Sequence, residues 1–89
     1  MDAIQLTIHH FPKNKQKYYF QSLDLIDVVF NTSELDINLS DLKEILNRGA
    51  IYNNSYVTIK KVNKYDKMRL CVNDGVTDKG KIIVKWISL

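Results

Sequence analysis

The stretch that decides the fold is NLSDLKEILNRG, residues 38–49. Leu42, Ile45 and Leu46 recur at the spacing of one helix face. Asn38 or Ser40 can cap the first turn, because an Asn or Ser side-chain oxygen accepts a hydrogen bond from a free backbone N–H there. The glycine at the end of the stretch favours the left-handed conformation in which many helices stop. The stretch therefore predicts a short helix with defined ends.

A second helix is predicted just before it, over residues 22–30. Leu23, Ile26 and Phe30 recur at helical spacing, and Ser22 is a suitable N-cap. Asp24 lies in the first turn, where the helix dipole favours a negative charge. Two short consecutive helices have the order of a helix-turn-helix, a motif that places its second helix in the major groove of DNA.

On both sides of these helices, apolar and polar residues alternate with the period of a β-strand. This pattern predicts a β-hairpin over residues 3–21 and strands over residues 55–62, 67–72 and 81–89. The last strand is mostly apolar on both faces, which predicts a central position in the sheet. Asn73-Asp74-Gly75 and Asp78-Lys79-Gly80 are turn sequences, so we expect a hairpin loop of several residues before the last strand.

The predicted order of elements is therefore ββααβββ, and the predicted fold class is α+β. A mostly antiparallel sheet would carry both short helices on one face. The chain shows no linker, internal repeat or low-complexity tract, so residues 1–89 are expected to form a single domain.

Composition and the ends of the chain bear on its location. No apolar run approaches the ~20 residues that a membrane helix needs, and the first ten residues lack the features of a signal peptide. The one cysteine, Cys71, cannot form an internal disulfide and is predicted to be a half-buried strand residue. We therefore expect a cytoplasmic protein. Its frequent Lys, Asn, Ile and Tyr residues are typical of small phage or mobile-element proteins.

The net charge of +3 hides a division along the chain. Residues 22–47 contain six Asp or Glu residues and one lysine, a net charge of −5. The remaining residues contain twelve Lys or Arg and four Asp or Glu, a net charge of +8. The helical segment is therefore acidic, and the predicted strands and turns are basic.

Two sets of candidate binding residues follow from this division. The acidic set, suited to a basic protein surface, comprises Asp24, Asp27, Glu34, Asp36, Asp41 and Glu44. The second set interleaves lysines with tyrosines, which suits nucleic acid or an acidic partner, and comprises Lys13, Lys15, Lys17, Tyr52, Tyr56, Lys60, Lys61 and Lys64.

The charge of the second helix argues against its use as a DNA-reading helix. Its first turns offer Asp41 and Glu44, with Lys43 as the only favourable group. Carboxylates in the major groove are repelled by the flanking phosphates, and recognition helices normally offer Arg, Lys, Asn or Gln there. If this chain touches nucleic acid, we expect the contact on the strands.

Phe20-Gln21-Ser22 precedes the first predicted helix, Arg48-Gly49 follows the second, and Tyr52 and Tyr56 lie in the strand that comes next. With these features, residues 20–60 resemble the NUMOD-type DNA-binding repeats attached to phage homing endonucleases. The resemblance implies a helix-turn-helix that binds DNA. It covers less than half of the chain, its turn between the helices is longer than that family prefers, and its second helix lacks the family's Ser/Thr/Arg-rich start.

The sequence carries no pattern that predicts an enzyme. His9 and His10 are adjacent, so on a strand they face opposite ways and cannot both serve one site. The acidic residues show no metal-binding or paired-carboxylate spacing, and the three glycines form no phosphate-binding loop. We expect a non-enzymatic protein without a cofactor or a metal.

Three functions remain open. The first is a phage or mobile-element protein that binds and inhibits a host macromolecule such as a nucleic-acid enzyme, in the manner of anti-CRISPR or anti-restriction proteins. The second is a nucleic-acid-binding module that uses its Lys/Tyr-rich strands. The third is an assembly subunit whose last strand extends a neighbour's sheet. The sequence favours the first, as a monomer or small homo-oligomer in the host cytoplasm, with no membrane partner.

Overall fold

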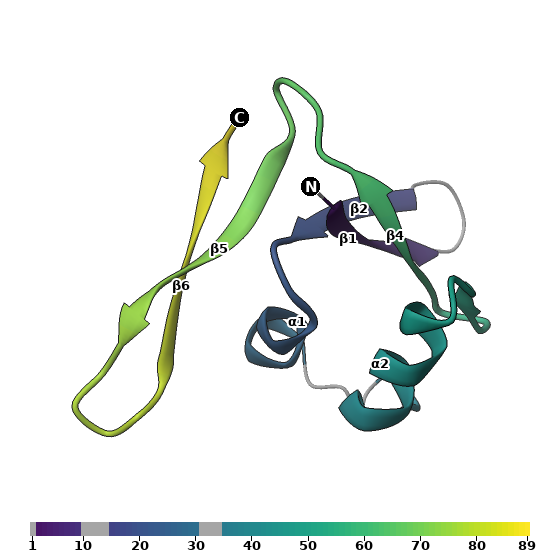
Figure 1. The fold of residues 1–89 in the computed structure, drawn as a ribbon, viewed down its shortest axis with the longest axis horizontal. Helices are drawn as coiled ribbons and strands as arrows, with labels where there is room; N and C mark the ends of the chain where they lie inside the picture. The colour runs from purple at the N-terminus through teal and green to yellow at the C-terminus, as the bar shows by residue number, and fades with distance from the viewer. Residues whose placement is uncertain (1, 10–14, 31–34) are drawn as a thin grey trace.

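The computed structural model describes residues 2–9, 15–30 and 35–89 (Figure 1). Within these ranges the chain forms, in order, β1 (Asp2–His9), β2 (Lys15–Phe20), α1 (Leu23–Val29), α2 (Leu39–Asn47), β3 (Tyr52–Asn53), β4 (Val57–Asn63), β5 (Arg69–Val76) and β6 (Ile82–Ser88). The α+β class is confirmed. The short strand β3 was not predicted, and it adds one strand to the predicted order.

All six of these strands belong to one sheet, in the order β3-β4-β1-β2-β5-β6. β1 pairs antiparallel with β2 and with β4, which brings Leu6 opposite both Tyr18 and Ile59. β2 and β5 run parallel, and their ladder includes only the pairs Tyr19 with Leu70 and Phe20 with Cys71. Every other pairing is antiparallel, so the prediction of a mostly antiparallel sheet is confirmed.

Both helices lie below β1, β2 and β4 in the view of Figure 1. Alternation along β1 turns one set of apolar side chains toward the helices and the polar ones away from them. The resulting core is fully buried and contains, among others, Leu6, Phe20 and Ile59 from the sheet and Ile26 and Leu42 from the helices. Each such side chain contributes about 1.5–3 kcal/mol through its removal from water.

The helix ends follow from local sequence. The Asn38 side chain accepts a hydrogen bond from the backbone N–H of Asp41 at 2.8 Å, so Asn38 is the N-cap of α2. Gly49, with a φ of 77°, takes the left-handed conformation expected after the helix. Ser22 is the N-cap of α1, but its side chain makes no capping hydrogen bond.

The prediction that the last strand is central is wrong, because β6 lies at the edge of the sheet. Its two faces are apolar for different reasons: Val84 and Trp86 pack against the helix-side core, whereas Ile83 is exposed. Asn73-Asp74-Gly75 is also not a turn. It forms an irregularity within β5, and the turn follows at residues 77–81. An unpaired strand edge is the feature that assembly by sheet extension requires.

A smaller apolar cluster lies on the helix-free face of the sheet. It contains Ala3, Met68, Leu70 and Val72, with Tyr19 packed against it. The connection between β4 and β5 supplies Met68 and passes above the ends of β1 and β2 in Figure 1. This face is therefore apolar beside β5 and polar beside β1 and β4.

Candidate functional site

The polar part of the helix-free face is centred on β1. Gln5 of β1 stands between Tyr19 of β2 and Lys60 of β4 in the register, and Thr7 stands between Lys17 and Thr58. Gln5 and Thr7 are only 9% and 7% exposed. The aliphatic parts of the neighbouring lysine side chains can cover Gln5 and Thr7 while the lysine ammonium groups stay in water. We call Gln5, Lys17, Tyr19, Lys60 and Tyr65 the Lys/Tyr face.

Tyr19 and Tyr65 form the aromatic part of the Lys/Tyr face. Their ring centroids are 5.8 Å apart with planes at 89°, and the side-chain nitrogen Nε2 of Gln5 donates to the Tyr19 hydroxyl at 3.2 Å. The pKa of Tyr19 is lowered, first by a hydrogen bond from Tyr65 and then by Gln5, Lys17 and Lys60, against an opposing effect of burial. The same hydrogen bond raises the pKa of Tyr65. Two cations, Lys17 of β2 and Lys60 of β4, therefore act on one phenol.

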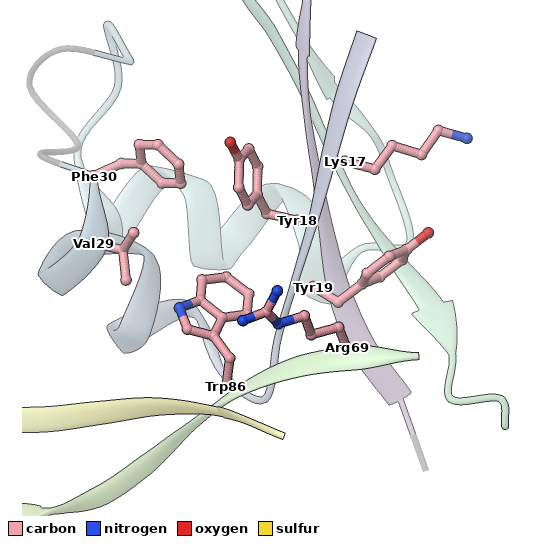
Figure 2. A pocket seen from close by; sticks show the side chains of 7 residues that line it. All are labelled: Lys17, Tyr18, Tyr19, Val29, Phe30, Arg69 and Trp86. Atoms are coloured by element: carbon pink, nitrogen blue, oxygen red, sulfur yellow. The ribbon is translucent and has the colours of Figure 1, made fainter. Parts of the chain in front are cut away.

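A cavity of about 580 Å³ lies beside the Lys/Tyr face, at the point where β2 and β5 diverge. Its apolar wall consists of Tyr18, Val29, Phe30 and Trp86, and Lys17, Tyr19 and Arg69 line the remainder. Figure 2 shows Tyr18 on one side of β2, facing Phe30, and Lys17 and Tyr19 on the other. The cavity thus joins the aromatic residues near α1 to the basic, helix-free face.

The predicted acidic set lies on the helical layer and on the segment before α2. Asp24 of α1 lies 3.7 Å from Lys43 of α2, and both side chains are about half exposed. The Asp41 carboxylate accepts from the Asn38 amide at 2.9 Å, and Glu44 is exposed one turn later. Asp27 and Asp36 are exposed as well, whereas Glu34 lies outside the described residues. The helical layer thus presents several carboxylates on the side opposite to Lys17 and Lys60.

The structure divides the predicted Lys/Tyr set. Lys17 and Lys60 share the Lys/Tyr face, and Lys15 occupies the corresponding position two residues earlier in β2. Lys61 has the opposite orientation in β4 because it pairs with Ile4, and Lys64 lies in the connection after β4. Lys13 lies outside the described residues.

The two tyrosines predicted for this set have other positions. The Tyr52 hydroxyl donates to the Leu35 carbonyl at 3.1 Å and accepts from Asn54 at 2.9 Å, so it fastens the segment before α2 to β3. Tyr56 is 69% exposed in the turn before β4, away from Tyr19 and Tyr65.

Sequence reasoning missed Tyr65, Arg69 and Trp86, which come from the β4–β5 connection, β5 and β6. The parallel pairing of β2 with β5 brings these three residues near Lys17. No local sequence pattern predicts that pairing. Tyr19 could have been predicted as a site residue, because Lys15, Lys17 and Tyr19 occupy alternate positions on one face of the same strand.

Within the described residues, no three His, Cys, Asp or Glu side chains are placed to hold a metal ion. The same residues include no helix of the length and apolar character needed to cross a membrane. Comparisons with protein-family models, with curated proteins and with solved structures each found no match. The NUMOD-type resemblance therefore stays a prediction.

Proposed function

We propose that this protein is a non-enzymatic binding protein that contacts a nucleic-acid strand through the Lys/Tyr face. The supporting observation is that Lys17 of β2 and Lys60 of β4 both act electrostatically on Tyr19, which meets Tyr65 on the side of the sheet away from the helices. Lysines on one face of a sheet can neutralise phosphates, and a tyrosine ring beside them provides a stacking surface for a base.

The distribution of charge favours the sheet over the helices. Among the described residues of β1, β2 and β4, no Asp or Glu occupies a position on the helix-free face. Asp41 and Glu44 of α2 lie on the opposite side, where a phosphate backbone would be repelled. Tyr65 is 52% exposed, which leaves ring surface available for contact.

The test is titration of a labelled single-stranded oligonucleotide and of a duplex at about 50 and 200 mM salt. Lys60→Gln is expected to weaken binding and to reduce the salt slope by about one unit. Tyr65→Leu is expected to weaken binding at both salt concentrations. Asp66→Asn, next to Tyr65, is expected to strengthen binding because it removes a negative charge.

Matched controls are Lys79→Gln in the exposed β5–β6 turn and Tyr56→Leu in the turn before β4. Both are expected to bind like the wild type. Absence of binding to any oligonucleotide, or equal effects of Lys60→Gln and Lys79→Gln, would contradict the proposal.

The acidic helical layer supports a second candidate function, inhibition of a host protein that has a basic surface. Asp36 and Glu44 are exposed on the side away from the Lys/Tyr face, so one protein can present both charges to different partners. This is the anti-CRISPR or anti-restriction type of role expected for a phage protein. The test is capture from a host lysate by the wild type and by Asp36→Asn/Glu44→Gln. A partner that is retained equally by both would contradict this role for the acidic residues.

A further inference from the structure

The cavity between β2 and β5 exists because these two strands pair over a short distance only. Their ladder joins Tyr19 to Leu70 and Phe20 to Cys71, and Gln21 N–H donates to the Cys71 carbonyl at 2.9 Å. β5 begins at Arg69, so β2 has no strand partner on this side before Tyr19. The space left, about 580 Å³, lies within the range of cavities that hold small organic groups.

The aromatic wall of this cavity is built from rings that do not stack on one another. The Tyr18 ring meets Phe30 at 5.3 Å with planes at 67°, and it meets Trp86 at 6.1 Å with planes at 55°. The Tyr18 hydroxyl donates to Gln16 at 2.7 Å, which fixes the ring. Tyr18, Phe30 and Trp86 are each only partly buried, so each keeps some surface for contact with a flat ligand.

Charge at the cavity favours an anionic ligand. Lys17 and Arg69 line it, and no Asp or Glu does so among the described residues. Arg69 lines the cavity together with Trp86, and Figure 2 shows Lys17 across β2 from Tyr18. Two cationic side chains and several aromatic rings therefore line the same cavity, which suits a flat ring joined to phosphates.

We propose that this cavity takes one unstacked base of a single-stranded nucleic acid, with its flanking phosphates against Lys17 and Arg69. The inference rests on the proposed function and specifies its ligand. Lys17 and Tyr19 belong both to the cavity lining and to the Lys/Tyr face, so one strand can follow both. A duplex cannot place a base here unless that base leaves the stack, so the cavity selects single strands.

The chain supplies its own reporter, because Trp86 is its only tryptophan. Trp86 fluorescence is measured while the full-length protein is titrated with a short oligothymidine, and then with an abasic strand of the same length. The intact strand is expected to quench Trp86, because a base stacks near the indole. The abasic strand is expected to bind through the lysines without that quenching.

A pair of variants on α1 tests the same cavity by filling it. Val29 lines the cavity, whereas its neighbour Val28 does not, and both are exposed. Val29→Phe is expected to weaken binding of the intact strand by about 5- to 100-fold, which corresponds to loss of a stacked base. Val28→Phe adds the same side chain outside the cavity and is expected to bind like the wild type. Thermal unfolding of both variants verifies the fold, and the abasic comparison needs no variant.

The outcomes separate this inference from the proposed function. Binding that depends on Lys60, with Trp86 fluorescence unchanged and Val29→Phe equal to Val28→Phe, overturns the base pocket alone. Failure of every oligonucleotide to bind overturns both proposals. Quenching of Trp86 by an acidic peptide containing phenylalanine, with no effect of oligonucleotides, overturns both in favour of a protein partner.

Discussion

Tyr19 and Tyr65 meet edge to face, with ring centroids 5.8 Å apart, and hydrogen bonding between their hydroxyls lowers the pKa of Tyr19 and raises that of Tyr65. Tyr65 donates to Tyr19 and so favours the Tyr19 phenolate. In Tyr65→Phe the pKa of Tyr19 is therefore expected to rise, and the late titration of Tyr65 is expected to vanish. Phenolate absorbance measured against pH tests this. Tyr56→Phe is the control, and an unchanged pKa of Tyr19 in Tyr65→Phe would contradict the hydrogen bond.

The N-caps of the two helices predict unequal costs for similar substitutions. Asn38→Ala removes the hydrogen bond to the Asp41 N–H and is expected to lower the free energy of unfolding by about 1 kcal/mol. Ser22→Ala is expected to cost less, because the Ser22 side chain makes no capping bond. Urea unfolding followed by Trp86 fluorescence measures both, and equal losses would argue against the cap at Asn38.

Cys71 lies in register between Phe20 and Trp86, fully buried, and burial raises the pKa of its thiol. Cys71→Ser places a hydroxyl in this apolar site and is expected to cost about 1–3 kcal/mol through desolvation. Cys71→Ala lacks the hydroxyl and is the comparison. If Ser proves no worse than Ala in urea unfolding, the site is more polar than the structure indicates.

The raised pKa of Cys71 also makes a prediction about pH and reactivity. A thiol that stays protonated longer in the folded state stabilises the protein fully below its ordinary pKa of 9.0, and this contribution is lost as pH rises through the higher folded value. Alkylation of the native protein at pH 8 is therefore expected to be slow and to accelerate sharply in urea. Rapid alkylation of the native protein would show that the thiol is accessible.

Gly75 has a φ of 135°, which L-residues rarely adopt, and it lies at the irregularity within β5. No atom would lie within 4 Å of an added Cβ, so Gly75→Ala tests backbone strain alone. The expected cost is about 1–3 kcal/mol. Gly80→Asn is the control, because asparagine tolerates the φ of 82° found there. Equal stability of both variants in thermal unfolding would contradict the strain.

Local patterns predicted most elements of this fold, because its helices and long strands have clear periods. They failed where the outcome depended on partners distant in the sequence. Ile83 and Val84 make β6 apolar on both faces, which predicted a central strand, yet sheet position is decided by hydrogen-bonding partners rather than by side chains. Gly75 suggested a turn because glycine serves turns and bulges for the same conformational reason.

The candidate site was predicted in the same partial way. Lys17 and Lys60 were named because lysines alternate with tyrosines in the sequence, and antiparallel pairing with β1 placed both on one face. Tyr52 was named because it lies near lysines, but its hydroxyl holds the Leu35 carbonyl instead. Trp86 and Arg69 reach the cavity through the parallel ladder between β2 and β5. A ladder of two residue pairs produces no recognisable pattern in the local sequence, so it could not be predicted.

The position of β1 between β2 and β4 has a consequence for the newly made chain. Among the strands described here, β1 comes first along the chain, and its second partner β4 follows only after both helices, since Asp2 pairs with Asn63. While the ribosome is still making the helical segment, the β1–β2 hairpin has an open edge along β1, and open edges recruit other strands. Efficient folding in the cell therefore depends on how quickly β4 follows, and truncation before Val57 is expected to increase aggregation relative to the full chain.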